Sequence, residues 1–189
     1  MRVLAGTFAL AQALALAACG ATGEPVAEIA PTGDPLTDAA ALLAAAETAR
    51  DAEARAPLVT RLDAMGVRLA DGGEDDPLAT WRAEHVARGA VPFRGRALGP
   101  AYRRARLGAG QRMTIEQVFY AGERAEIVGQ ASDGSNVAIA IRNPREERVC
   151  AKPLAPRADC RWLPVFTERF AIELANNGAS DASVYLVFR

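Results

Sequence analysis

The sequence predicts a mainly β protein, an antiparallel β-sandwich of about eight strands in a jelly-roll-like arrangement, preceded by an N-terminal α-helical segment. Two patterns lead to this fold class. Up to about residue 90, an alanine-rich stretch places its large apolar residues at helical spacing. From about Tyr102 onward, short runs that alternate apolar with polar residues follow one another about 10–15 residues apart, with turn residues and no helical stretch between them.

Residues 1–18 show the features of a secretory signal peptide in their usual order, with Arg2 followed by a largely apolar run. The run has about 16 residues, fewer than the ~20 that a membrane-spanning helix needs. It ends in Leu16-Ala17-Ala18-Cys19, which resembles the lipobox of bacterial lipoproteins. That resemblance implies lipidation of Cys19 and, because residue 20 is not aspartate, a lipid anchor in the bacterial outer membrane, on its periplasmic face. The alternative is a plain secretory signal that is cut after Ala17.

Residues 19–33 are interpreted as the lipidated cysteine and a flexible tether, because Gly, Pro and small residues dominate them. Residues 34–90 form the predicted helical segment. Asp34-Pro35 supplies an N-cap acceptor and a proline at the first helical position. The alanine-rich stretch from Leu36 to Arg55 has high helix propensity, and Pro57 is expected to end or kink this first helix.

Two more helices are expected before residue 90. The apolar face of the second comprises Leu58, Leu62, Met65 and Leu69. The loop over residues 71–76 carries four carboxylates but lacks the alternating ligands of a calcium loop. We therefore expect a solvated loop whose negative charge stabilises the N-terminus of the helix that follows. Asp76-Pro77 repeats the cap signal and begins a short helix that contains Trp81 and His85.

Residues 100–189 are predicted to form the sandwich domain. Its clearest strand patterns are Met113–Glu116, Ala125–Ile127, Val137–Ile141, Phe170–Leu174 and Val184–Phe188. Gly, Asn, Asp and Pro residues between these runs supply the turns. Such spacing without intervening helices is typical of an antiparallel sandwich.

Three segments of this half, Glu116–Ala125, Phe170–Gly178 and Ser183–Val187, are similar to the strand–Ala-Gly–strand corner and the final hairpin of one bacterial family. The stretch 100–189 thus resembles the bacterial pre-peptidase C-terminal domain, a small β-sandwich appended to many secreted proteins. The resemblance implies a sandwich fold and an accessory, binding-type role. Where that family often has an Asp-x-x-Gly turn, this chain has Asn143-Pro144-Arg145-Glu146, so the resemblance implies no calcium ligands here.

Cys150 and Cys160 are the two cysteines that remain once Cys19 carries lipid. In an oxidising compartment, an even pair at this spacing favours a disulfide. Metal ligation would need further ligands, and no histidine lies near them in the sequence. Trp162 follows Cys160 by two residues, so we expect its indole to pack on the bridge, with carbohydrate stacking as the alternative.

Charge is segregated along the chain. Residues 20–84 carry 13 acidic and 5 basic side chains, net −8; residues 85–115 carry net +7; and residues 116–189 carry 10 acidic and 9 basic, net −1. The candidate anion-binding residues are Arg94, Arg96, Arg103, Arg104 and Arg106. Two interpretations stay open. The Arg88–Arg112 segment either lies across the acidic helices as an intramolecular clamp or binds an anionic envelope polymer, lipopolysaccharide or peptidoglycan, through paired guanidinium hydrogen bonds.

Together these features predict a lipid-anchored, non-enzymatic adaptor or binding protein of the cell envelope. No cofactor, metal site or nucleic-acid partner is expected, and the sequence sets no oligomeric state. A periplasmic hydrolase is the least favoured alternative. His85 is the only histidine in the sequence, and no Gly-x-Ser-x-Gly motif accompanies the serines Ser132, Ser135, Ser180 and Ser183.

Overall fold

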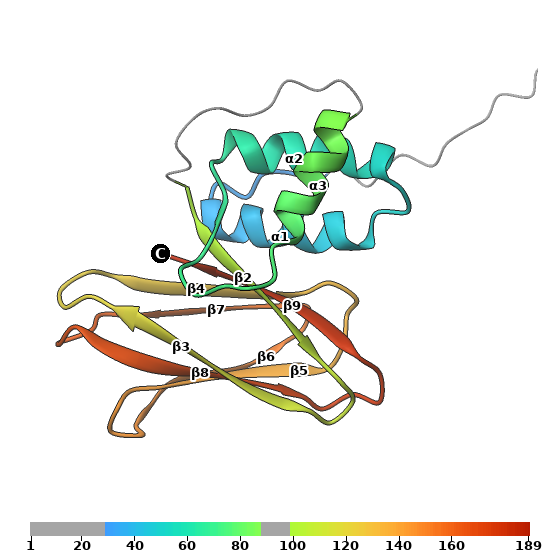
Figure 1. Cartoon of the computed structure of the whole chain (residues 1–189). Coiled ribbons are helices and arrows are strands. Elements are labelled where there is room, and N and C mark those ends of the chain that lie inside the picture. Colours follow the sequence, from blue (N-terminus) through green and yellow to red (C-terminus); the bar gives the residue numbers. More distant parts are fainter. Residues whose placement is uncertain (1–28, 88–98) are drawn as a thin grey trace, which may run out of the picture.

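The computed structural model describes residues 29–87 and 99–189, which fold into three layers (Figure 1). Three helices cover one face of a five-stranded sheet, and a four-stranded sheet packs against its other face. The mainly β fold class, a sandwich preceded by a helical segment, is therefore confirmed. The signal peptide, Cys19, Arg94 and Arg96 lie outside the described residues, together with the expectations attached to them.

The helical layer contains α1 (Pro35–Thr48), α2 (Ala52–Ala64) and α3 (Pro77–Ala87). Asp34 caps α1 as the sequence predicts, because its carboxylate accepts a hydrogen bond from the Leu36 amide (3.3 Å). Asp76 acts in the same way at α3, where it accepts from the Ala79 amide (2.9 Å). Within the described part of the chain, no helix is long and apolar enough to cross a membrane.

The first helix ends earlier than the sequence predicts. The prediction of one helix that runs from Leu36 to Arg55 and ends at Pro57 is wrong. In the structure, α1 ends at Thr48 and the proline lies inside α2. Asp51 explains the difference. Its carboxylate accepts a hydrogen bond from the Ala54 amide (2.8 Å) and so begins a new helix ahead of the proline.

The five-stranded sheet, here the inner sheet, has the order β1-β2-β9-β4-β7. Its strands are β1 (Arg68–Leu69), β2 (Ala101–Leu107), β9 (Ala182–Phe188), β4 (Ala125–Ala131) and β7 (Arg157–Trp162). The outer sheet has the order β3-β8-β5-β6, with strands β3 (Arg112–Phe119), β8 (Glu168–Asn176), β5 (Val137–Arg142) and β6 (Arg148–Leu154). Neighbouring strands are antiparallel except β1, which pairs in parallel with β2. Leu69 therefore belongs to a strand rather than to the second helix.

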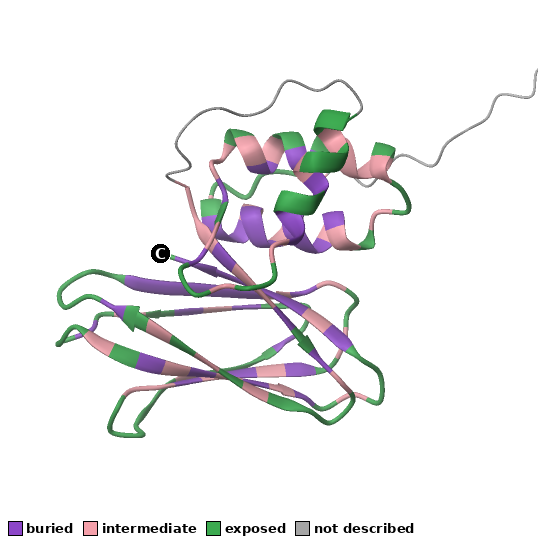
Figure 2. Ribbon diagram, in the orientation of Figure 1, coloured by how far each residue is buried: buried purple, intermediate pink, exposed green. Residues whose placement is uncertain are grey.

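The central strands of the inner sheet, β9 and β4, are buried on both faces (Figure 2). On β9, Val184 and Leu186 pack in the core between the sheets, while Tyr185 and Val187 pack in the core under the helices. Successive strand residues point to opposite faces, so a strand buried on both sides must be apolar throughout. This explains the near-continuous apolar run that ends the sequence.

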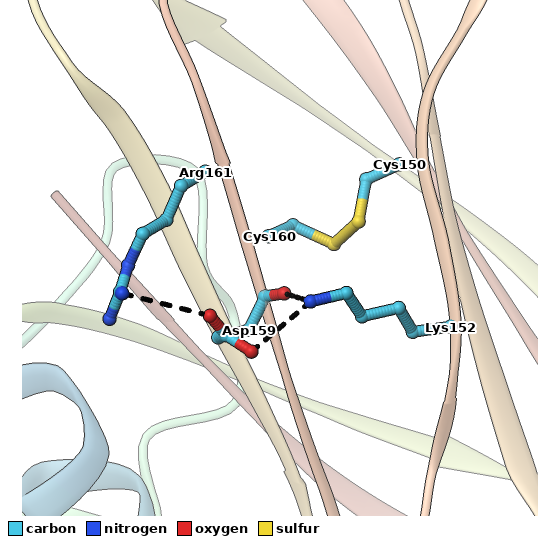
Figure 3. Close-up of a disulfide and its surroundings, with 5 residues drawn as sticks. All are labelled: Cys150, Lys152, Asp159, Cys160 and Arg161. Atoms are coloured by element: carbon cyan, nitrogen blue, oxygen red, sulfur yellow. Dashed lines mark hydrogen bonds and ion pairs between the residues drawn. A yellow bond between two sulfur atoms is a disulfide. The ribbon is translucent and has the colours of Figure 1, made fainter.

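One lateral side of the sandwich is closed by a disulfide (Figure 3). Cys150 of β6 and Cys160 of β7 are bonded, with Cα atoms 6.0 Å apart, which confirms the predicted bridge and joins the edge strands of the two sheets. Beside it, Lys152 donates to the Asp159 carboxylate (3.2 Å) and so holds the pKa of that carboxyl below its ordinary value. Trp162 packs against the core that contains Cys160.

Candidate binding surfaces

Arg104 lies beneath the helical layer with its side chain only 8% exposed. Its guanidinium donates to Glu47 in the last turn of α1 (2.7 Å) and to both carboxylate oxygens of Asp75 (2.7 and 2.5 Å). Burial alone would lower the pKa of Arg104, but these hydrogen bonds outweigh it and raise the pKa. Glu47 also accepts from the Tyr185 hydroxyl, and burial together with this hydrogen bond raises the pKa of Tyr185. The guanidinium is thus engaged within the protein.

The other two described candidates for anion binding face the same acidic loop. Arg103 donates from Nη2 to the Asp71 carbonyl oxygen. Arg106 is 65% exposed and lies with its Nε 3.9 Å from the Asp75 carboxylate. The three arginines of β2 therefore lie against residues 71–75, an arrangement that favours the clamp interpretation for this part of the basic segment.

The acidic loop is a connector between the helical layer and the inner sheet. Asp76 accepts from the Tyr102 hydroxyl (2.6 Å), and that hydroxyl oxygen accepts in turn from the Leu78 amide (3.2 Å). Burial, reinforced by Asp76, raises the pKa of Tyr102. Among residues 29–87 and 99–189, no group of three or more His, Cys, Asp or Glu side chains is placed to hold a metal ion.

A second ionic contact joins the first helix to the far edge of the inner sheet. Glu126 on β4 is 2% exposed, and its two carboxylate oxygens accept hydrogen bonds from Arg161 and Arg189. Arg161 also lies 3.3 Å from the Asp34 carboxylate at the start of α1. The buried carboxylate is thereby paired twice, which offsets the cost of removing it from water.

The groups that a hydrolase would need lie on different layers. His85 is on α3, with its Nε2 3.4 Å from the Thr60 hydroxyl. The four serines lie in turns of the sandwich or at the start of β9. In the described part of the chain, no serine is bonded to the histidine.

Three loops lie together at one end of the sandwich (Figure 1) and join β3 to β4, β5 to β6, and β7 to β8. The first and the last of them carry large apolar residues that are exposed to solvent. We call the following set the loop-end surface: Tyr120 (61% exposed), Leu163 (65%), Val165 (76%) and Phe166 (58%). Sequence reasoning missed it, although the apolar stretch Leu163–Phe166 contains a proline and lies outside any alternating run, which was an available signal.

Hydrogen bonds fix the loops of this surface to one another. The Gly122 amide donates to the Pro164 carbonyl (3.0 Å), and the Ala121 amide donates to the Thr167 hydroxyl (3.0 Å). From the third loop, the Arg145 guanidinium lies 5.9 Å from the centroid of the Phe166 ring, within cation–π range. The backbones of the loops that carry the apolar residues are therefore held together by the fold.

A groove of about 1270 Å³ opens on the lateral side opposite the disulfide. One wall is β3, the edge strand of the outer sheet, and the other is the β1–β2 edge of the inner sheet with the loops beside it. We call it the β3 groove. It contains Arg103 from the sequence-predicted set, and at one end it reaches Tyr120 of the loop-end surface.

No known protein family matches the sequence, and no curated protein matches it either. Solved structures with a similar fold include the pre-peptidase C-terminal domain of a collagenase from Bacillus anthracis (6% identity, 48% of this chain and 89% of that one, TM-score 0.43). Others are a mitogen from Yersinia pseudotuberculosis (7%, 48% and 84%, TM-score 0.41) and a periplasmic inhibitor of g-type lysozyme from Aeromonas hydrophila (13%, 48% and 86%, TM-score 0.36). The first of them belongs to the family that residues 100–189 resemble, and at these values the likeness is one of fold.

Proposed function

We propose that this protein is a lipid-anchored, non-enzymatic binding module of the cell envelope, and that it binds a protein partner through the loop-end surface. The observation that carries the proposal is the gathering of four large apolar side chains, 58–76% exposed, on loops tied together by hydrogen bonds. Contiguous exposed apolar side chains mark interaction sites, and aromatic residues are enriched where proteins meet.

A protein partner suits this surface better than an anionic polymer. Its contact groups are two aromatic rings and two aliphatic side chains, with Arg145 at the rim. An apolar centre with a polar rim is the usual anatomy of a protein interface. Arg104 of β2, by contrast, is already bound by the carboxylates of Glu47 and Asp75.

Site-specific photo-crosslinking in native membranes tests the proposal. A photoreactive amino acid at Val165 should capture one protein partner at low and at high salt, because burial of apolar groups is not screened as charge pairs are. The matched control is Val86, an apolar residue on α3 that is 38% exposed, which should capture nothing.

A substitution makes the result decisive. Phe166→Asp should abolish the adduct formed at Val165, while Val86→Asp should leave it unchanged, and both variants should melt like the wild type because both positions are exposed. The proposal is wrong if Val165 yields no adduct or if the adduct survives Phe166→Asp in a folded protein.

A further inference from the structure

We propose that the outer edge of β3, which pairs with no strand among residues 29–87 and 99–189, binds an extended segment of the partner protein as an added strand. The β3 groove is then a peptide-binding site continuous with the loop-end surface. The inference rests on the proposed function and names how part of the partner is bound. Addition of a strand to an exposed sheet edge gives affinity through main-chain hydrogen bonds.

The register shows which backbone groups of β3 are not bonded to β8. The backbone amide of Asn176 donates to the Gln111 carbonyl. The odd-numbered residues of β3 are therefore the ones whose backbone groups bond to β8. In an antiparallel ladder the bonded positions alternate. The N–H and C=O groups of Thr114, Glu116 and Val118 therefore point away from β8, toward the groove, where the Val118 carbonyl also accepts a hydrogen bond from the Gln117 side chain (3.3 Å). A row of such groups matches the backbone of another strand.

The two edge strands of the outer sheet, β3 and β6, differ in how well their outward backbone groups are protected. The same alternation of bonded positions can be followed from β8 through β5 to β6. It shows that the backbone groups at positions 151 and 153 of β6 point away from β5, toward solvent. Position 153 is proline, which has no N–H, and Lys152 and the disulfide lie beside it. These are the usual means of protecting an edge strand. β3 carries no proline along its length.

The shape of the groove fits one extended strand. Its volume exceeds the range of about 300–1,000 Å³ that is usual for small-molecule pockets. It has a second wall, formed on the inner-sheet side by Arg68, Gly72 and Ala101 among others. A single strand can lie between two walls, whereas a second copy of the protein would have to bring a whole sheet edge into the same space.

Charge favours an acidic segment. Two of the arginines that line the groove are paired, Arg169 with Glu116 and Arg189 with Glu126. The other three, namely Arg68, Arg103 and Arg124, have no carboxylate partner among the described residues. They outnumber the two unpaired carboxylates of the lining, Asp71 and Glu123. An apolar side chain at one end of the segment would lie beside Tyr120.

The probe is a fluorescein-labelled peptide of eight residues, the length of β3, in which valine alternates with glutamate and threonine and the last residue is phenylalanine. Full-length protein in mild detergent should bind it in a fluorescence-anisotropy titration. Thr114→Pro removes one outward N–H without touching the bonds to β8, and should weaken binding by about tenfold or more. Ala151→Pro makes the same change on the opposite edge and should leave binding unchanged.

Backbone hydrogen exchange identifies the mode of binding. In the free protein the amides of Thr114, Glu116 and Val118 should exchange fast, and the peptide should protect them. The inference is overturned if these amides are already protected without peptide, since another part of the chain or a second copy then covers the edge. It is also overturned if folded Thr114→Pro binds as well as the wild type. If the crosslink from Val165 persists in either case, the proposed function stands and only strand addition falls.

Discussion

At the scale of single residues, Asn176 holds together the turns at the end of the sandwich away from the loop-end surface. It is 2% exposed, and its amide nitrogen, which carries two N–H groups, lies within hydrogen-bond distance of three carbonyls, those of Leu107, Gly108 and Ser180. Its side-chain oxygen accepts from the Gly178 amide (2.9 Å). One buried side-chain amide thus joins the backbones of two turns.

Asn176→Ala should lower the free energy of unfolding by about 2 kcal/mol, because it leaves buried carbonyls and an amide without a partner. Urea denaturation monitored by circular dichroism measures the loss. The neighbouring exposed Asn177 provides the control, since Asn177→Ala should change stability by less than about 0.5 kcal/mol. Equal effects of the two substitutions would contradict this role.

Asp75 gives the clamp a pH dependence. The hydrogen bond from Arg104 holds the pKa of Asp75 below its ordinary value. A carboxyl with a depressed pKa in the folded state adds stability that is fully present above its unfolded pKa, near 3.9, and is lost as pH falls through the folded value. The wild type should therefore exceed Asp75→Asn in melting temperature at pH 6, and the difference should shrink steadily below about pH 4. A difference that stays constant down to pH 2 would exclude this linkage.

At the scale of elements, the alternation of apolar residues located most of the sandwich. β5 and β8 are buried on one face only, so apolar residues recur at every second position and the sequence pattern predicts these strands. The break between α1 and α2 was not predicted. Alanine propensity favours one long helix, and Asp51 is followed by alanine rather than by the proline that marks the caps at Asp34 and Asp76. The loop-end surface was missed because exposure of Leu163 to Phe166 depends on how three loops meet, which no spacing records.

The disulfide is the one covalent cross-link between the edge strands β6 and β7 in the described residues. Replacing Cys150 and Cys160 together by serine should lower the free energy of unfolding by about 2–4 kcal/mol, because the open chain gains conformational freedom. Native protein should also show no thiol at these positions when titrated under denaturing, non-reducing conditions. Two titratable thiols would contradict the bridge.

At the scale of the whole molecule, the helices are part of the sandwich rather than an attachment to it. Tyr102, Val128, Tyr185 and Val187 of the inner sheet are buried in the core that the helices complete. The boundary near residue 100 that composition indicates is therefore crossed by a shared core. Composition could show the change of periodicity but not that the inner sheet needs cover on both faces.

A fragment of residues 99–189 should consequently be poorly soluble or bind the dye ANS strongly, because those four side chains become exposed. The measurement compares ANS fluorescence of the fragment with that of the full mature protein at equal concentration. A fragment that is soluble, melts cooperatively and does not bind ANS would show that the sandwich folds without the helices.

The anchor remains a prediction of the sequence. Cys19→Ala should leave the protein unprocessed or release it from the membrane, because several acyl chains at about 0.8 kcal/mol per buried methylene supply the attachment. Fractionation of cells followed by immunoblotting measures the outcome. Complete retention of the variant in the membrane, in processed form, would contradict lipidation at this residue.

The bridge from Asp34 to Arg161 and Glu126 has a mechanical consequence for the tether that the sequence predicts. Any pulling force that enters from the residues before Asp34 meets the sandwich at once, since Arg161 lies on β7 and Glu126 on β4. Part of the load therefore reaches the five hydrogen-bonded strands and part passes along α1, because a half-exposed ion pair contributes only about 1 kcal/mol or less. The ion pair thus gives the predicted tether a second connection to the sandwich, beside the backbone of α1.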